Sequence, residues 1–126
     1  MPKILVIEDD VMVRNTIARI LSRAGYDLMV APDGRQGLAL FESEYPELVI
    51  TDLVMPEKEG IETIREIRGM RPDAKIIAIS GGGRLGNTDY LLMAAKFGAR
   101  EIIAKPFEPS ELTEAVSRCL APAVQE

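Results

Sequence analysis

The sequence of 126 residues contains no histidine and only one cysteine, Cys119. Without histidine the chain cannot form a Ser/His/Asp or Cys/His catalytic group, a metal site with histidine ligands, or a phosphohistidine of its own. Cys119 falls in the last segment with helical periodicity. Because a lone cysteine in such a segment is usually a small buried hydrophobic residue, we assign it no redox role.

Long apolar runs and basic clusters are missing as well. No apolar run approaches the roughly 20 residues that a membrane-spanning helix needs, and the N-terminal segment MPKILVIEDD has no cleavage-like site of small residues. The 15 Lys and Arg residues are outnumbered by 20 Asp and Glu residues, which gives a formal net charge of −5. No run of Lys or Arg alternates with aromatic residues, as nucleic-acid binding would require. We therefore expect one cytoplasmic domain that contacts neither nucleic acid directly nor a membrane.

Short apolar runs alternate with segments of helical periodicity along the whole chain. This pattern predicts an α/β fold in which a doubly wound sheet of five parallel strands is covered by five helices. The strands are expected near residues 3–7, 27–31, 48–52, 75–80 and 101–105. The first predicted helix ends at Gly25, the second follows Asp33-Gly34, and the third ends before Pro72. The fourth ends at Gly98, and the fifth begins at Pro109. Residues 1–121 would then form the domain, and residues 122–126 a short tail.

Polar residues follow four of the predicted strands. Glu8 and Asp9 follow the first strand, and Asp52, Ser80 and Lys105 come at the ends of the third, fourth and fifth. In an open parallel sheet the ligand crevice lies at the carboxyl ends of the strands. We therefore expect all of these side chains at one rim of the sheet, where they form a single site.

The acidic part of this site predicts a divalent cation. Two unit charges about 4 Å apart repel by roughly 4 kcal/mol at an effective dielectric constant near 20, so the carboxylates of Glu8, Asp9 and Asp52 need a cation between them. Hard oxygen ligands with open positions suit Mg²⁺, which prefers one or two carboxylates together with phosphate oxygens. Asp52 stands alone on its strand end, which makes it the candidate nucleophile toward a phosphoryl group, with Lys105 as a second cation.

The segments ILVIEDD, TDLVMP, IIAIS, Gly98-Ala99 and AKPF, in this order and spacing, resemble the receiver domain of two-component response regulators over nearly the whole chain. The resemblance implies a flavodoxin/CheY-like fold, a phosphoacceptor at Asp52 and a Mg²⁺ site. It further implies metal binding by Glu8, Asp9, Asp52 and the backbone carbonyl of Val54, phosphoryl contacts from Ser80 and Lys105, and a cis Lys105-Pro106 peptide.

The resemblance also implies what the protein does. We expect a stand-alone, single-domain receiver that is not an enzyme beyond its own phosphorylation and dephosphorylation. Since the chain has no histidine, a sensor histidine kinase or a histidine phosphotransfer protein would supply the phosphoryl group. The output would be a surface change read by an unidentified target protein, and the receiver would be a monomer or a weak dimer that forms on phosphorylation.

Two features depart from the family pattern. Ile102 stands where the family usually has an aromatic residue that moves during activation, and the stretch from Ser80 to Gly98 is about three residues longer than the family norm. Glycine places the least restraint on the backbone. We therefore expect the glycine-rich loop of residues 81–88 and the helix near residues 90–97 to carry the signal by an order change over the site.

Other interpretations of these motifs remain. The acidic residues after the first strand could cap the helix that follows, and the whole chain could be an interaction domain that is never phosphorylated. Gly81-x-Gly83-x-x-Gly86 with Glu101 fits a dinucleotide fingerprint, but in the fourth βα unit rather than the first. Val54 replaces the second aspartate of a haloacid dehalogenase type phosphatase, and Gly83-Arg84-Leu85 does not match a P-loop.

Overall fold

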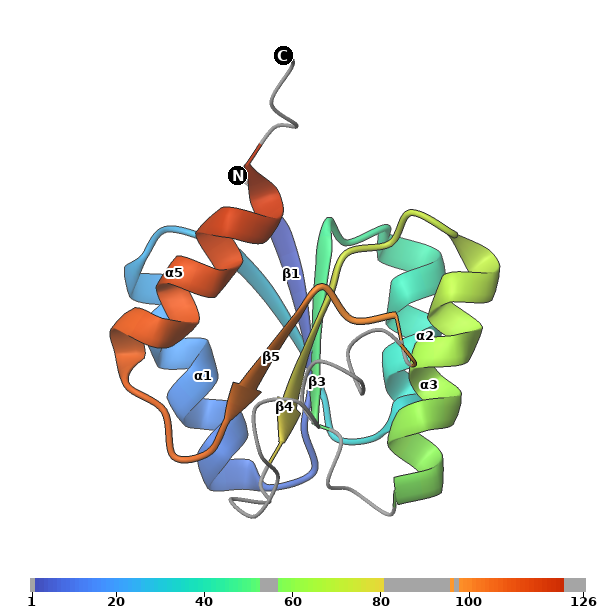
Figure 1. The fold of residues 1–126 in the computed structure, drawn as a ribbon, viewed down its shortest axis with the longest axis horizontal. Coiled ribbons are helices and arrows are strands. Elements are labelled where there is room, and N and C mark those ends of the chain that lie inside the picture. The colour runs from blue at the N-terminus through green and yellow to red at the C-terminus, as the bar shows by residue number, and fades with distance from the viewer. Residues whose placement is uncertain (1, 53–56, 81–95, 97, 122–126) are drawn as a thin grey trace.

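The computed structural model of the chain describes residues 2–52, 57–80, 96 and 98–121. Strands and helices alternate along it (Figure 1). The strands are β1 (Lys3–Ile7), β2 (Asp27–Ala31), β3 (Leu48–Asp52), β4 (Ile76–Ser80) and β5 (Glu101–Ala104). The helices are α1 (Val11–Arg23), α2 (Gly34–Glu44), α3 (Glu57–Met70) and α5 (Pro109–Leu120). The fourth predicted helix, expected to end at Gly98, lies outside the described residues apart from Lys96, and so does the glycine-rich loop before it.

The described strands form one sheet in the order β2-β1-β3-β4-β5, and every neighbouring pair is parallel. This confirms the predicted doubly wound α/β fold. The first crossover leads from β1 to β2 on one side, whereas β3 to β5 follow on the other side. The order of strands therefore reverses between β1 and β3, and a ligand crevice is expected at their carboxyl ends.

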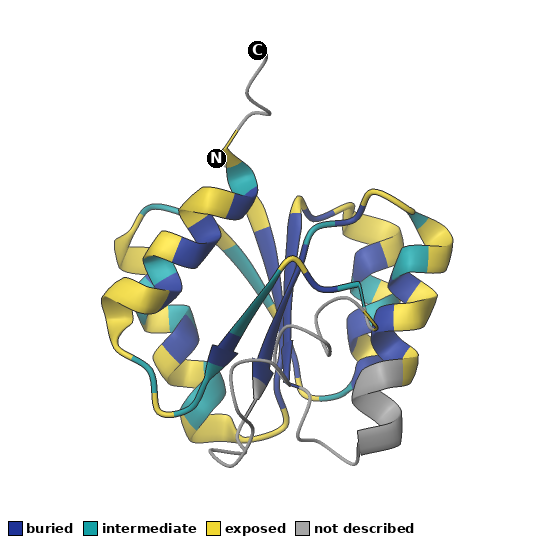
Figure 2. Cartoon of the chain, in the orientation of Figure 1, coloured by how far each residue is buried: buried dark blue, intermediate teal, exposed yellow. Residues whose placement is uncertain are grey.

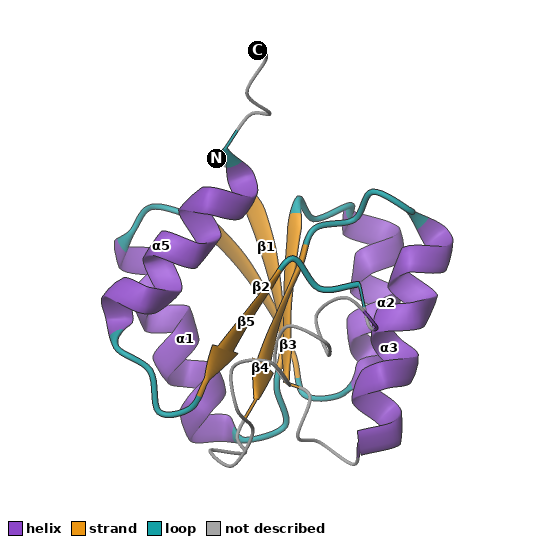
Figure 3. Cartoon of the chain, viewed as in Figure 1, coloured by secondary structure: helices purple, strands orange, loops and turns teal. Residues whose placement is uncertain are grey.

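Helices cover both faces of the sheet, with α1 and α5 on one face and α2 and α3 on the other (Figure 3). Alternate residues of β1 serve the two layers: Ile4 and Val6 pack in the cluster with α1 and α5, and Leu5 and Ile7 pack in the cluster with α2 and α3. Burial on both faces explains why the strands are continuous apolar runs in the sequence. The central strands β1, β3 and β4 are accordingly the most deeply buried, whereas the edge strands β2 and β5 are partly exposed (Figure 2).

Local signals place the ends of the helices. The carboxylate of Asp10 accepts hydrogen bonds from the backbone N–H groups of Met12 at 2.9 Å and Val13 at 3.3 Å, which caps α1. Asp33 caps α2 in the same way through Gln36 N–H at 2.9 Å. After α1, Gly25 has φ of 96°, a left-handed conformation that favours glycine. No described helix has the length and apolar character that crossing a membrane requires.

Candidate functional site

Four charged side chains meet at the carboxyl ends of three strands. Glu8 and Asp9 follow β1, Asp52 is the last residue of β3, and Lys105 follows β5 directly. Carboxylate oxygens of the three acidic residues lie within 4.8 Å of one another. The structure therefore brings together the side chains of four of the six predicted site residues.

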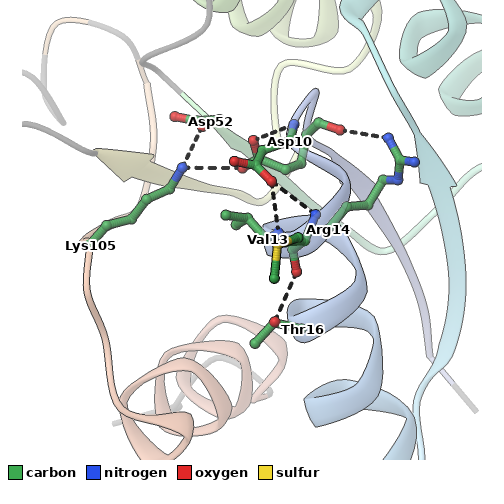
Figure 4. A network of polar contacts seen from close by, with 8 residues as sticks. Asp10, Val13, Arg14, Thr16, Asp52 and Lys105 are labelled. Carbon is green, nitrogen blue, oxygen red and sulfur yellow. Dashed lines mark hydrogen bonds and ion pairs between the residues drawn. The ribbon is translucent and has the colours of Figure 1, made fainter.

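Lys105 bridges the two buried carboxylates of this cluster (Figure 4). Its Nζ donates a hydrogen bond to Asp52 Oδ2 at 2.7 Å and lies 3.5 Å from Glu8 Oε1. Partial burial of the ammonium group lowers the pKa of Lys105, but the hydrogen bond and the charge of Asp52, together with Glu8, outweigh it and raise the pKa. Lys105 is thus held as a cation against the carboxylate of Asp52.

Glu8 is a buried carboxyl group whose pKa is raised on folding. Only 1% of its surface is exposed. Burial raises the pKa of Glu8 from 4.5 to about 7, and the negative charge of Asp52 adds to the effect, whereas the Asp10 N–H and Lys105 act in the opposite direction. Its Oε2 accepts a hydrogen bond from the Asp10 N–H at 3.1 Å, while Oε1 accepts none from the described residues.

These features fit a hard divalent cation. The donor set consists of carboxylate oxygens from Glu8, Asp9 and Asp52, and Glu8 Oε1 is a buried oxygen that no described hydrogen-bond donor satisfies. Oxygen ligands of this kind suit Mg²⁺. A cation here would offset the repulsion among the three carboxylates and would lower the pKa of Glu8.

Two predicted members of the site are described only in part. The backbone of Ser80 pairs with Ala104, the residue before Lys105, so its Cα lies at the same rim. The side chain of Ser80 and the carbonyl of Val54 lie outside what the structure describes. The cis peptide at Lys105-Pro106 that the resemblance implied is present.

The three acidic residues after β1 have two different roles: one caps a helix, as the simpler interpretation of the sequence proposed, and two belong to the carboxylate cluster. Asp10 is a helix cap, as the simpler interpretation proposed for these residues. Glu8 and Asp9 instead contribute oxygens to the cluster with Asp52. Sequence reasoning missed Arg14, whose Nη1 donates a hydrogen bond to the Glu8 carbonyl at 3.1 Å. The only sequence signal for it is a basic residue one helical turn after the acidic triplet.

Two residues of β5 bear on the other expectations. Ile102 pairs with Ala78 of β4 and packs against the apolar cluster under α2 and α3, so an aliphatic side chain occupies the place of the family's aromatic residue. Glu101, the acidic residue of the possible dinucleotide fingerprint, accepts two hydrogen bonds of 2.9 Å from the guanidinium of Arg118 on α5. The glycines of that fingerprint lie outside the described residues.

Comparisons with known proteins show which family and which fold the chain has. The family described as response regulator receiver domain matches residues 4–117. The chain is 34% identical over 117 residues to the chemotaxis protein CheY of Thermotoga maritima, covering 92% of this chain and 95% of that protein. It is 38% identical to the probable transcriptional regulator ycf27 of Galdieria sulphuraria, but that match spans 94% of this chain and 44% of the regulator. A solved receiver domain protein from Clostridium thermocellum superposes with a TM-score of 0.84 at 30% identity, covering 95% of this chain and 94% of the other.

Proposed function

The chain belongs to the response regulator receiver domain family, and from this premise we propose that it takes up a phosphoryl group on the carboxylate of Asp52. Receiver domains are signalling modules controlled by phosphorylation. The observation that carries the assignment of Asp52 is its contact with Lys105, which lies 2.7 Å from Oδ2 at the centre of the carboxylate cluster.

The proposed chemistry is a transfer between histidine and aspartate. An oxygen of Asp52 attacks phosphorus, and a P–O bond forms while the bond from phosphorus to the donor's imidazole nitrogen breaks. The electron pair of the broken bond stays on that nitrogen, which then takes up a proton. Lys105 is placed to neutralise charge on the incoming oxygens, since its ammonium already contacts Asp52.

We assign the metal site to Glu8, Asp9, Asp52 and the backbone carbonyl of Val54. When bound, Mg²⁺ would supply charge neutralisation for the phosphoryl oxygens. The carboxylates of Glu8 and Asp9 hold that charge beside Asp52, because all three side chains present oxygens within 4.8 Å of one another. Ser80 is proposed to donate a hydrogen bond to the phosphoryl group. The position of its backbone beside Ala104 supports this role.

The signalling role follows from the family, and its details are part of the proposal. Because this chain has no histidine, a separate sensor histidine kinase or histidine phosphotransfer protein supplies the phosphoryl group. The transfer takes place in the cytoplasm. Phosphorylation adds negative charge and acceptor oxygens at the rim, which changes the surface that a target protein binds. The receiver is proposed to be a monomer or a weak dimer that forms on phosphorylation. Its only chemistry is its own phosphorylation and dephosphorylation.

The intact mass of the protein tests the phosphoacceptor. Incubation with a small-molecule phosphodonor and Mg²⁺ should add the mass of one phosphoryl group to the wild type and none to Asp52→Asn, because an amide oxygen does not form the acyl phosphate. Asp10→Asn is the matched control: Asp10 caps α1, and asparagine caps helices about as well as aspartate. This variant should gain mass as the wild type does.

Two results would contradict the proposal. A mass gain in Asp52→Asn would place the phosphoacceptor elsewhere. No gain in the wild type, with Mg²⁺ and donor in excess, would favour the alternative of an interaction domain that is not phosphorylated.

A further inference from the structure

The loop that carries two of the proposed metal ligands, residues 8–10, is fixed by hydrogen bonds at both ends. At its start the Glu8 N–H donates to the carbonyl of Ala31 in β2 at 3.0 Å. At its end the Asp10 N–H donates to Glu8 Oε2 at 3.1 Å, and the Asp10 carboxylate caps α1. Between these ends lies the peptide group that joins Glu8 to Asp9.

Arg14 holds the carbonyl of that peptide group. Its Nη1 donates a hydrogen bond to the Glu8 carbonyl oxygen at 3.1 Å, and its own backbone N–H donates to the Asp10 carbonyl at 2.9 Å. Figure 4 shows the guanidinium of Arg14 reaching back from α1 toward the loop. The side chain is half-buried, so a rigid helix fixes the direction of the peptide.

The orientation of this peptide matters most for Asp9. Because a peptide unit is planar, fixing its carbonyl also fixes the direction in which the next residue leaves the plane. Glu8 is buried and held by its surroundings, whereas Asp9 is exposed. The backbone is therefore the main means by which the described structure can direct the Asp9 carboxylate toward Glu8 and Asp52.

We propose that Arg14 is a positioning residue for the cation site: by holding the Glu8 carbonyl it directs the Asp9 carboxylate to the place where a divalent cation binds. This inference rests on the proposed function of the site. It predicts that removal of Arg14 changes the Mg²⁺ affinity in the direction opposite to the one expected from charge alone. A guanidinium near a cation site repels the cation, so its removal would strengthen Mg²⁺ binding if charge alone mattered. Loss of positioning weakens binding instead.

The test is the Mg²⁺ dissociation constant, measured by isothermal titration calorimetry. Arg14→Met keeps the length of the side chain without its donors, and it should bind Mg²⁺ about tenfold more weakly than the wild type, as loss of an outer partner typically does. Arg14→Lys keeps a charged donor but not the planar fork, and its affinity should lie between the two. Arg19→Met is the matched control, because Arg19 is an exposed arginine on the same helix. Its affinity should equal that of the wild type.

The melting temperature of each variant in a metal chelator separates positioning from a purely structural role. A structural role would lower the melting temperature of Arg14→Met and leave its Mg²⁺ affinity within twofold of the wild type, and that result would overturn the inference. Tighter Mg²⁺ binding by Arg14→Met would overturn it too. If Arg14→Met does not fold, Arg14→Lys with wild-type affinity overturns the inference, and a reduced affinity supports it. A wild type that binds no Mg²⁺ would instead overturn the proposed metal site itself.

Discussion

At the scale of single residues, the chemistry of the site comes from crowding like charges into a buried rim. Glu8 and Asp52 are both almost fully buried, and Lys105 is the cation that contacts both. One ammonium group does not balance the three carboxylates of the cluster. Burial raises the pKa of Glu8, and the negative charge of Asp52 adds to this effect, so protonation of Glu8 removes one negative charge from the cluster.

The stability of the metal-free protein should therefore depend on the charge of Glu8. The pKa of Glu8 rises from 4.5 to about 7 on folding, so between these values the folded protein binds more protons than the unfolded chain. The free energy of unfolding then falls as the pH rises through this interval. With about 1.4 kcal/mol for each unit of pKa shift, the fall attributable to Glu8 is at most roughly 3 to 4 kcal/mol.

Urea unfolding in a metal chelator measures this effect. The wild type should lose more stability than Glu8→Gln across the interval between the two pKa values, because glutamine does not titrate. Saturating Mg²⁺ should reduce the difference, since the cation favours the ionised carboxylate. Parallel pH profiles for the two proteins without metal would contradict the origin assigned to this pKa shift.

At the scale of elements, the close approach of α2 to β1 depends on one glycine. Gly37 is buried in α2, and a Cβ atom at this position would lie 2.7 Å from Cγ1 of Ile7. Ile7 pairs with Ala31 and Thr51 and is itself buried. The helix therefore lies directly on the end of the strand that leads into Glu8.

Alanine at Gly37 should lower the free energy of unfolding by roughly 1–3 kcal/mol, because overpacking costs more than the gain of up to about 1 kcal/mol in helix propensity. Gly69 on α3 provides the control, since it is exposed and a Cβ there would meet no atom within 4 Å. Gly69→Ala should be neutral or raise the free energy of unfolding by up to about 1 kcal/mol. Chemical denaturation of the wild type and both variants checks this. A free energy of unfolding for Gly37→Ala equal to that of the wild type would contradict the prediction and show that α2 can move away from β1 without cost.

At the scale of the whole molecule, the sequence predicts the sheet better than the site. The first three strands have the predicted limits, and β4 and β5 are each one residue shorter than predicted. Parallel strands that are buried on both faces leave continuous apolar runs. Glycine, proline and acidic caps mark the ends of the helices, as at Gly25, Asp33 and Pro109. These are local signals, and local signals can be found in a sequence.

The site residues were also predictable, because they follow strands whose carboxyl ends meet at one rim. Their interactions were not. The contact between Lys105 and Asp52 joins residues 53 positions apart, and the raised pKa of Glu8 depends on burial in the folded chain and on the charge of Asp52. The role of Arg14 rests on a side chain bonding to a backbone carbonyl. No motif records such a bond, because any residue can supply the carbonyl.

Chemical trapping of the phosphorylated residue tests the central claim most directly. Sodium borohydride reduces an aspartyl phosphate to homoserine, which marks the modified position permanently. After treatment with a phosphodonor and Mg²⁺, reduction, digestion and tandem mass spectrometry should find homoserine at position 52, and at no other aspartate. Homoserine at position 9 or 10 with aspartate intact at position 52 would contradict the assignment of Asp52 as the phosphoacceptor.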